Sequence, residues 1–413
     1  MRIFWGGLKR KNHKWAVGSK LSETKGWDEL DIQPQQSPYV MKKRSHIKVL
    51  FINSVNGSMG RLSKALMMYE GIEADCIVPS FYPRRNFVYP GEANIYQIFT
   101  HEDWRQYLKW AVRHYDIIQT STFPIWPAVA ECYDWLTKVL GQRHVWRETG
   151  FVHHYLHREE ILPLKDYFSD IRSRRPPQPE RFCCNTFQHN TTHFLTGTNM
   201  VFYSSPEKGA YLNGKHTYWL PTIRDPECFK VKDKLDNKDN LLIYVPHHDN
   251  AAWKGFTIIN QMLRECRDEG LPIEIVTATT AHQYFPEIVY FDFSKTKSED
   301  RKPYPLPYYM IPELLNHVDI VVDQIVMGCY GNTAVEAMLT GIPVVGQKRY
   351  EEIKDAPIWE VTIDNFKVRM RELINNPEHR VQLGSQGRNW AIAHHSPQAV
   401  AKIAAEKYRM ILE

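Results

Sequence analysis

The stretch DQIVMGCYGNTAVEAMLTGIPVVG, from Asp323 to Gly346, decides what kind of fold the chain can adopt. It follows the apolar run VDIVV and ends on the apolar run IPVVG, with a short helical pattern between them. One interpretation is a strand–helix–strand unit whose first turn holds a ligand. The alternative is a buried crossover that contains an ordinary capped helix. The other segments of the chain bear on this choice.

Composition indicates a folded protein with two or three domains. The chain has 413 residues, of which 43% are hydrophobic and 13% aromatic, so it can form sizeable cores. A net charge of +5 permits an anionic ligand but does not demand nucleic acid. The seven cysteines are scattered without C-x-x-C spacing, which argues against a disulfide framework and against a zinc ribbon.

The N-terminal segment, residues 1–45, is basic and irregular. It lacks the apolar stretch of a signal peptide, and no run in the chain reaches the roughly 20 apolar residues of a transmembrane helix. We therefore expect a cytoplasmic protein. The basic segment is either a solvated arm or a contact for DNA or an anionic membrane surface, and a membrane contact would make the protein peripheral.

Strands and helices alternate in two series, one starting at HIKVLFINS (residues 46–54) and one at NLLIYVPHH (residues 240–248). Continuous apolar strands that alternate with helices are typical of parallel sheets. The sequence therefore predicts the α/β class, with two Rossmann-like doubly wound domains that face a cleft. The predicted units are the basic arm 1–45, an N-terminal domain 46–230, a C-terminal domain 231–396 and a crossover helix 397–413 that packs back on the N-terminal domain.

The loop after VDIVV has the composition of a phosphate-binding turn. Gly328 and Gly331 let the backbone approach an anion, and the next helix points its first N–H groups at it. Glu336 lies one turn into this helix, where a carboxylate can accept both hydroxyls of a ribose. Thr333 and Glu336 also match a capping box, and Gly341 an ordinary helix C-cap, which needs no ligand. Both explanations stand at this point.

A Lys-Gly pair, Lys254 and Gly255, follows the first strand of the second series. An ammonium group at this place can bind a diphosphate, although an ordinary surface lysine is the simpler explanation. Because the carboxyl ends of parallel strands meet at one edge of a sheet, Lys254 is expected to face the same cleft as the Gly328 loop.

A small-residue turn also follows the first strand of the N-terminal series. Gly57, Ser58 and Gly60 make this turn flexible where it opens a helix. The spacing is neither GxGxxG nor a Walker loop, so the dinucleotide and P-loop interpretations lose support. A tight turn alone explains these residues equally well.

A polar cluster, Glu148, His153 and His154, follows the strand RHVW. At a cleft-facing strand end such groups can position an acceptor hydroxyl or stabilise developing charge. Adjacent histidines rarely face one metal ion, and no third ligand has a recognisable spacing, so we expect no metal site. Histidines on a helix surface are the simpler alternative.

The order of these features resembles the GT-B glycosyltransferases, in particular the retaining, nucleotide-sugar-dependent glycosyltransferase family 4. The segment VDIVVDQIVMGCYGNTAVEAMLTGIPVVG is similar to that family's donor loop, in which small residues precede a helix with the pattern E-A-M-x-x-G-x-P-V-V. HHDNAAWKGF resembles the family's donor-phosphate segment, and YYMIPELLNHVDIVV the stretch before the donor loop. The layout covers most of residues 46–413, but the specific motifs lie between Pro246 and Gly346.

The resemblance implies a role for each motif residue. It implies that Glu336 holds the donor ribose and that Lys254 binds the diphosphate. It also implies that the Gly57–Gly60 turn approaches the sugar phosphate from the other domain. The backbone amides that complete the phosphate cradle are then those around Tyr330, Gly331, Asn332 and Thr333.

The chain departs from the family pattern at two positions. The acid that usually contacts the transferred sugar falls on Gly328, and Asp323 lies close enough in sequence to take its place. The basic residue that often precedes the lysine is absent, and the pair His247–His248 holds the candidates for it. One member of the pair His153–His154 takes the position of the family's N-terminal-domain histidine.

These residues predict a glycosyltransferase that moves a sugar from a nucleoside diphosphate to a hydroxyl acceptor. Lys254 and helix-terminus amides, rather than a metal or another cofactor, would stabilise the leaving diphosphate. The acceptor is a glycan, a lipid-linked intermediate or a hydroxymethylated DNA base. Two alternatives share this layout. One is a nucleotide-sugar epimerase, which needs no acceptor. The other is a catalytically silent nucleotide-sugar-binding protein, and the presence of Gly328 where the family has an acid favours it.

Overall fold

The computed structural model describes the two α/β regions and the C-terminal helices, with gaps between the described segments. The described residues are 46–52, 58–79, 95–98, 100–122, 127–148, 200–206, 216–231, 239–246, 254–277, 280–284, 310–326 and 328–413. The predicted arm 1–45 and four predicted site residues, Gly57, His153, His154 and His248, lie outside these ranges.

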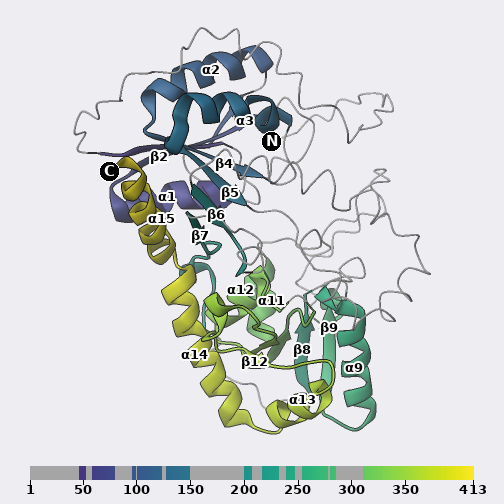
Figure 1. The fold of residues 1–413 in the computed structure, drawn as a ribbon. Helices are drawn as coiled ribbons and strands as arrows, with labels where there is room; N and C mark the ends of the chain where they lie inside the picture. Colours follow the sequence, from purple (N-terminus) through teal and green to yellow (C-terminus); the bar gives the residue numbers. More distant parts are fainter. Residues whose placement is uncertain are drawn as a thin grey trace, which may run out of the picture.

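The N-terminal region is a seven-stranded parallel sheet with the strand order β3-β2-β1-β4-β5-β6-β7 (Figure 1). The order runs outward in both directions from β1, as in doubly wound sheets. The strands are β1 Lys48–Ile52, β2 Glu73–Pro79, β3 Ile95–Ile98, β4 Ile117–Thr122, β5 His144–Glu148, β6 Met200–Tyr203 and β7 Thr217–Trp219. The helices are α1 Ser58–Glu70, α2 His101–His114 and α3 Pro127–Leu140, with the 3-10 helix Gly141–Arg143.

Strand β1 is buried on both faces. Val49 and Phe51 pack in one hydrophobic cluster with residues of α1, whereas Leu50 and Ile52 pack in another with residues of α2 and α3. Successive side chains of a strand point to opposite faces, so a strand that is covered on both sides needs an unbroken apolar run. The sequence KVLFI meets this requirement and places the end of β1 at the edge where α1 begins.

The C-terminal region is a five-stranded parallel sheet with the strand order β12-β11-β10-β8-β9. The strands are β8 Leu241–Val245, β9 Ile273–Thr277, β10 Ile320–Val322, β11 Val344–Gly346 and β12 Trp359–Glu360. The helices are α9 Phe256–Asp268, α10 Ala281–Tyr284, α11 Ile311–His317, α12 Asn332–Thr340 and α13 Phe366–Ile374, with the 3-10 helix Glu351–Ile353. Together the two sheets confirm the predicted α/β class with two Rossmann-like domains.

Two long helices, α14 Pro377–His395 and α15 Pro397–Leu412, run from the C-terminal domain to the N-terminal domain (Figure 1). α14 packs against α12, and α15 packs against α1. The break falls at Ser396, which is extended (φ −61°, ψ 154°) because Pro397 disfavours a helical residue before it. Helix α15 is therefore the predicted crossover helix.

The packing of α14 on α12 depends on a glycine. A Cβ atom at Gly384 of α14 would overlap the carbonyl oxygen of Gly341, which ends α12 in a left-handed conformation with φ 80°. The backbone of α14 can therefore lie directly against the end of α12. This close approach fixes the distance between the C-terminal helices and the loop that precedes α12.

We expect Gly384→Ala to lower the free energy of unfolding by about 1–3 kcal/mol, because the added methyl group forces the two backbones apart. Denaturation with urea provides the measurement. Ser385→Ala, at the exposed neighbouring position in the same helix, is the matched control and should change stability by less than about 0.5 kcal/mol. Equal stability of the two variants would contradict the close approach.

Candidate functional site

The loop between β10 and α12 is held in shape by its own side chains. Asp323, buried directly after β10, accepts a hydrogen bond from the backbone amide of Gly331 across the loop. The side-chain nitrogen of Gln324 donates to the carbonyl oxygen of Cys329 at 2.8 Å. Both contacts fold the loop back toward the strand, so that the start of α12 lies beside the end of β10.

Gly328 is a structural requirement of this loop. Its backbone has φ 74°, a left-handed conformation that glycine adopts without strain. Arg349 covers it, because a Cβ atom at Gly328 would overlap the aliphatic part of the Arg349 side chain. The backbone amide of Arg349 also donates to the Gly328 carbonyl oxygen at 2.8 Å. No acid fits at this position unless Arg349 moves.

The turn that contains Lys254 and Gly255 lies against the same loop. The backbone amide of Ile325 donates to the carbonyl oxygen of Lys254 at 3.3 Å. Gly255 has φ 81°, and a Cβ atom there would lie 2.9 Å from Cγ2 of Val326. The structure therefore brings the Lys-Gly turn and the small-residue loop together at one edge of the C-terminal sheet.

Helix α12 does not begin with the predicted capping box. Its first residue is Asn332 and its N-cap is Gly331, without a side-chain cap. Thr333 is thus inside the helix and too far along to cap it with Glu336. Glu336 instead accepts a hydrogen bond through Oε1 from Nε of Arg224 at 2.7 Å, and the two side chains are 3% and 5% exposed, respectively. The capping-box explanation of Glu336 is wrong, because this glutamate belongs to a buried ion pair.

Arg224 comes from the segment that joins the two domains. It lies between β7 and the 3-10 helix Pro226–Cys228. Its Nη1 donates to the carbonyl oxygen of Ile223 at 2.9 Å. Its backbone amide donates to the carbonyl oxygen of His395 at 2.9 Å. The guanidinium group therefore connects the linker to α12, while the backbone connects it to the end of α14.

The side chain of Tyr330 anchors the loop to α14. Its hydroxyl lies 2.8 Å from Nε2 of His395, whose Nδ1 lies 2.8 Å from the carbonyl oxygen of Thr222. A carbonyl oxygen only accepts, so Nδ1 carries the proton and Nε2 accepts from the tyrosine hydroxyl. Burial lowers the pKa of His395 from 6.5 to about 3, so the ring is neutral at pH 7.

The start of α12 is accessible. Asn332 is exposed, and Gly331 and Thr333 are partly exposed, as is Lys254 on the neighbouring turn. The first turn of a helix carries a partial positive charge, and the backbone of the Lys254 turn contacts the loop that leads into this helix. This edge of the sheet is therefore suited to an anionic group such as a diphosphate.

In the N-terminal domain, the structure places some of the predicted residues. Ser58 and Gly60 are buried in the first turn of α1, and Glu148 is the last residue of β5. The hydroxyl of Tyr203, at the end of β6, donates to Oε1 of Glu352, just after β11, at 2.6 Å. The end of β6 thus contacts the 3-10 helix Glu351–Ile353 of the C-terminal domain, and Glu148 lies next to Tyr203 in register.

Three residues that shape this site had no motif in the sequence: Arg224, Arg349 and His395. Arg224 was visible only as a basic residue near the end of the predicted N-terminal domain, 46–230. Arg349 follows the last strand of the quoted stretch, and His395 ends a helix far from it in sequence. Spacing does not indicate that these side chains reach Gly328, Tyr330 and Glu336.

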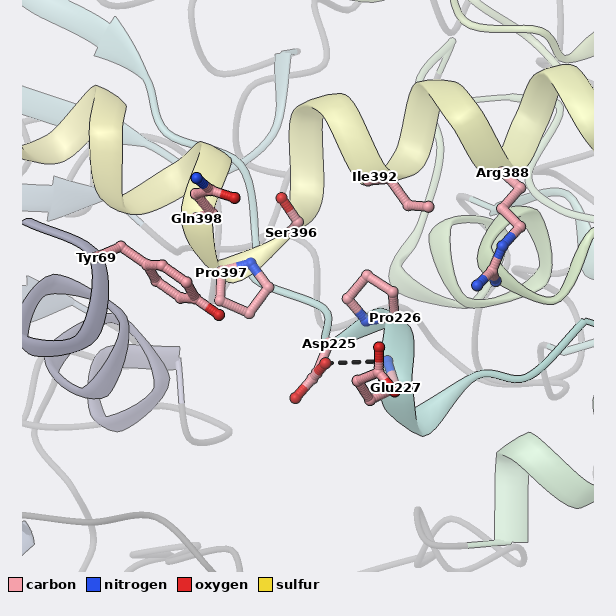
Figure 2. Close-up of a pocket in the computed structure, with 9 residues that line it drawn as sticks. All are labelled: Tyr69, Asp225, Pro226, Glu227, Arg388, Ile392, Ser396, Pro397 and Gln398. Carbon is pink, nitrogen blue, oxygen red and sulfur yellow. Dashed lines mark hydrogen bonds between the residues drawn. The ribbon is translucent and has the colours of Figure 1, made fainter.

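A separate pocket of about 320 Å³ lies where the linker meets the break between α14 and α15 (Figure 2). Asp225 closes one side of it, with Oδ1 accepting from the backbone amide of Glu227 at 3.0 Å. Arg388 and Ser396 line it from α14 and the helix break. It contains none of the predicted site residues, so it is a feature of the domain junction.

Two findings concern metals and membranes. Within the described ranges, no group of three or more histidine, cysteine, aspartate or glutamate side chains is arranged to hold a metal ion. No helix in that part of the chain is both long and apolar enough to cross a bilayer. The pair His153–His154 lies outside these ranges.

No family model matches the chain, and neither does any curated protein. Among solved structures, sucrose-phosphate synthase from Thermosynechococcus elongatus has a TM-score of 0.56 at 14% identity over 89% of this chain and 99% of that one. HepE of Anabaena, in complex with UDP and glucose, has a TM-score of 0.56 at 16% identity over 88% and 100%. An alpha-glucosyltransferase in complex with UDP-glucose and DNA containing an abasic site has a TM-score of 0.55 at 11% identity over 89% and 100%. At such identities the likeness concerns the fold, and the chain has the two-domain GT-B architecture.

The removal of one partner from the buried ion pair between Arg224 and Glu336 should destabilise the fold, because the other charge is then left unpaired. We expect Arg224→Met to lower the free energy of unfolding by about 3–5 kcal/mol, because it leaves a buried carboxylate without its partner. The double variant Arg224→Met/Glu336→Leu should recover a large part of this loss, as measured by urea denaturation. Additive effects of the two substitutions would contradict direct pairing.

The burial of two histidines predicts that the free energy of unfolding falls as the pH is lowered. Burial lowers the pKa of both His144 and His395 to about 3, below the unfolded value of 6.5, so the unfolded state binds more protons between these values. Their contribution is complete above pH 6.5 and is lost as the pH falls toward 3, at about 1.4 kcal/mol per pH unit for each ring. His395→Gln should flatten the slope of unfolding free energy between pH 6 and about 5. An unchanged slope would mean that His395 is protonated in the folded state.

Proposed function

We propose that the protein is a glycosyltransferase that moves a sugar from a nucleoside diphosphate to a hydroxyl acceptor. The observation that carries this proposal is the contact between the Lys254–Gly255 turn and the loop from Gly328 to Thr333. This contact gathers a lysine, close-approach glycines and a helix N-terminus at one strand edge, which is suited to a diphosphate. The GT-B architecture supports the proposal, since HepE, which shares it, has been solved with UDP and glucose.

In the proposed reaction, charge develops on the diphosphate as its bond to the sugar breaks. We propose that the ammonium group of Lys254 and the positive end of α12 face the position at which this charge develops. They therefore stabilise the transition state more than the bound donor. We further propose that this stabilisation requires no metal, and that the anomeric configuration is retained as in the resembled family 4.

Glu336 is proposed as the group that accepts the ribose hydroxyls. Arg224 holds one carboxylate oxygen at 2.7 Å, so the carboxylate meets the nucleoside in one fixed orientation. The linker residue then becomes a positioning residue for the donor. Glu148 and the pair His153–His154 are the proposed groups that position the acceptor hydroxyl from the other domain.

The acceptor is proposed to be a glycan, a lipid-linked intermediate or a hydroxymethylated DNA base. The solved alpha-glucosyltransferase with UDP-glucose and DNA makes duplex DNA a natural probe alongside glycans. If the basic segment 1–45 contacts DNA phosphates or an anionic membrane surface, binding falls steeply as salt rises. A cytoplasmic location remains part of the proposal.

A second candidate is a nucleotide-sugar-binding protein without transferase activity. Gly328 and its covering residue Arg349 favour it, because the loop has no room for the acid that contacts the sugar in the resembled family. Asp323 is the nearest acid, but its carboxylate accepts the Gly331 amide and holds the loop. Turnover distinguishes this candidate from the transferase, whereas binding alone does not.

We expect UDP or another nucleoside diphosphate to raise the thermal unfolding midpoint of the 413-residue chain, because it binds only the folded state. Lys254→Ala should weaken binding about 10- to 100-fold through loss of a charged contact to phosphate. Lys402→Ala, an exposed lysine on α15, is the matched control and should bind like the wild type. A panel of nucleotides then identifies the base.

Product analysis with the stabilising nucleotide sugar separates the candidate functions. Transfer to an added acceptor supports the glycosyltransferase. Conversion of the donor to an isomeric sugar without acceptor would show an epimerase instead. Binding without turnover across glycan, lipid and DNA acceptors would favour the binding protein. A lack of stabilisation by every nucleotide would overturn the proposed donor site.

A further inference from the structure

A buried histidine ties the loop between β10 and α12 to the linker between the domains. The hydroxyl of Tyr330, in this loop, lies 2.8 Å from Nε2 of His395 at the end of α14. Nδ1 of the same ring lies 2.8 Å from the carbonyl oxygen of Thr222, in the linker. One imidazole ring therefore joins three segments that are far apart in the sequence. It is not among the groups that bind the donor or the acceptor in the proposed reaction.

The two contacts of His395 require one form of its ring. Nδ1 carries the proton and donates to Thr222, so Nε2 accepts from the hydroxyl of Tyr330. His395 and Tyr330 are 2% and 9% exposed, respectively. The ring centroids of Trp219 and Trp390 lie 6.3 Å and 5.7 Å from that of His395. A hydrogen bond in such apolar surroundings is stronger than one in water, so the loss of this acceptor is costly to the loop.

Tyr330 lies directly before the start of α12. The next residue, Gly331, is the N-cap of this helix, and the exposed Asn332 is its first residue. Asp323, directly after β10, fixes Gly331 by accepting a hydrogen bond from its backbone amide. The hydrogen bond from Tyr330 to His395 adds a second fixed point, on α14. The position of the first amides of α12 therefore depends on His395 as well as on the end of β10.

The linker at Thr222 is itself fixed to the N-terminal domain. Its neighbour Ile223 is 2% exposed and packs in one hydrophobic cluster with residues of α1 and α15. The next residue, Arg224, donates through its side chain to Glu336 of α12 at 2.7 Å and through its backbone amide to the carbonyl oxygen of His395 at 2.9 Å. Thr222 and Arg224 thus hold the loop and α12, while the residue between them lies in the core of the other domain. The position of the loop is therefore set relative to the domain that carries the proposed acceptor groups.

We propose that His395 is a positioning residue for the donor. It orients Tyr330, and through it the first backbone amides of α12, relative to the linker and the N-terminal domain. It acts only through the loop, so its loss weakens donor binding while the Lys254 turn keeps its own contact with Ile325. The inference rests on the proposed function, because it takes a nucleoside diphosphate as the ligand of the loop.

Two substitutions separate the two contacts of the ring. The amide of His395→Asn can replace Nδ1 and donate to Thr222, whereas the amide of His395→Gln can replace Nε2 and accept from Tyr330. Well below the unfolding temperature, we expect His395→Asn to bind UDP, or the nucleoside diphosphate that stabilises the wild type, about 3- to 10-fold more weakly, because one buried hydrogen bond is lost. Tyr330→Phe should show the same loss, and the double variant should bind no more weakly than either single variant. His395→Gln should keep most of the affinity.

His144→Asn is the matched control. His144 is also fully buried, and its ring nitrogens lie 3.0 Å and 2.9 Å from the hydroxyls of Thr120 and Thr137 in the N-terminal domain. We expect this variant to lose stability to urea but to bind the nucleotide like the wild type. Hydrogen exchange of the backbone amides from Gly331 to Thr333 should also stay as in the wild type, whereas it should become faster in His395→Asn and Tyr330→Phe.

The outcomes separate the positioning role from the proposed function. If the wild type binds a nucleotide and both His395→Asn and Tyr330→Phe bind it equally well, the positioning role is overturned and the donor site stands. The same holds if His144→Asn weakens binding as much as His395→Asn does. If the wild type binds no nucleotide, the proposed donor site is overturned. Faster amide exchange confined to the loop in His395→Asn and Tyr330→Phe would then still support the anchoring of the loop by His395, and unchanged exchange would overturn it.

Discussion

The buried ion pair between Arg224 and Glu336 is the contact on which the arrangement of the candidate site depends. Arg224 belongs to the linker between the domains, and Glu336 to the helix that follows the small-residue loop. Charges buried this deeply are stable only together, so the linker and α12 are held in one relative position. His395 extends the same constraint, because it contacts both Tyr330 in the loop and the carbonyl oxygen of Thr222 in the linker.

Close backbone approaches build the rest of the site. Gly255 lets the Lys254 turn lie against Val326, Gly328 lets Arg349 cover the loop, and Gly384 lets α14 lie against the end of α12. Each approach requires the absence of a Cβ atom, and two of the three also require a left-handed backbone. These three glycines, of which Gly328 lies in the quoted stretch, are therefore required by packing whether or not a ligand binds there.

The positive groups of the molecule are distributed over both domains. Lys254 and the start of α12 lie in the C-terminal domain, whereas Arg147, Arg61 and the start of α1 lie in the N-terminal domain. The hydrogen bond from Tyr203 to Glu352 joins the end of β6 to the 3-10 helix Glu351–Ile353 of the C-terminal domain.

Much of the fold could be predicted from the sequence, since apolar runs such as KVLFI and amphipathic helices report which faces are buried. The edge that holds Lys254 and the Gly328 loop was predictable for the same reason, because topology places the carboxyl ends of parallel strands together. The capping box of Thr333 and Glu336 was a local pattern that failed. Glu336 pairs instead with the buried Arg224, which is distant in sequence.

By itself, the sequence determined the α/β class, the order of strands and helices, the crossover helix and the edge at which the candidate donor residues gather. Only the tertiary structure decided that Arg224 pairs with Glu336, that Arg349 covers Gly328 and that Arg147 is buried. Hydrophobic periodicity and residue spacing describe neighbours within one helix or strand. Contacts between side chains far apart in the chain are set by how the sheets, the linker and the last two helices pack, which no local pattern specifies.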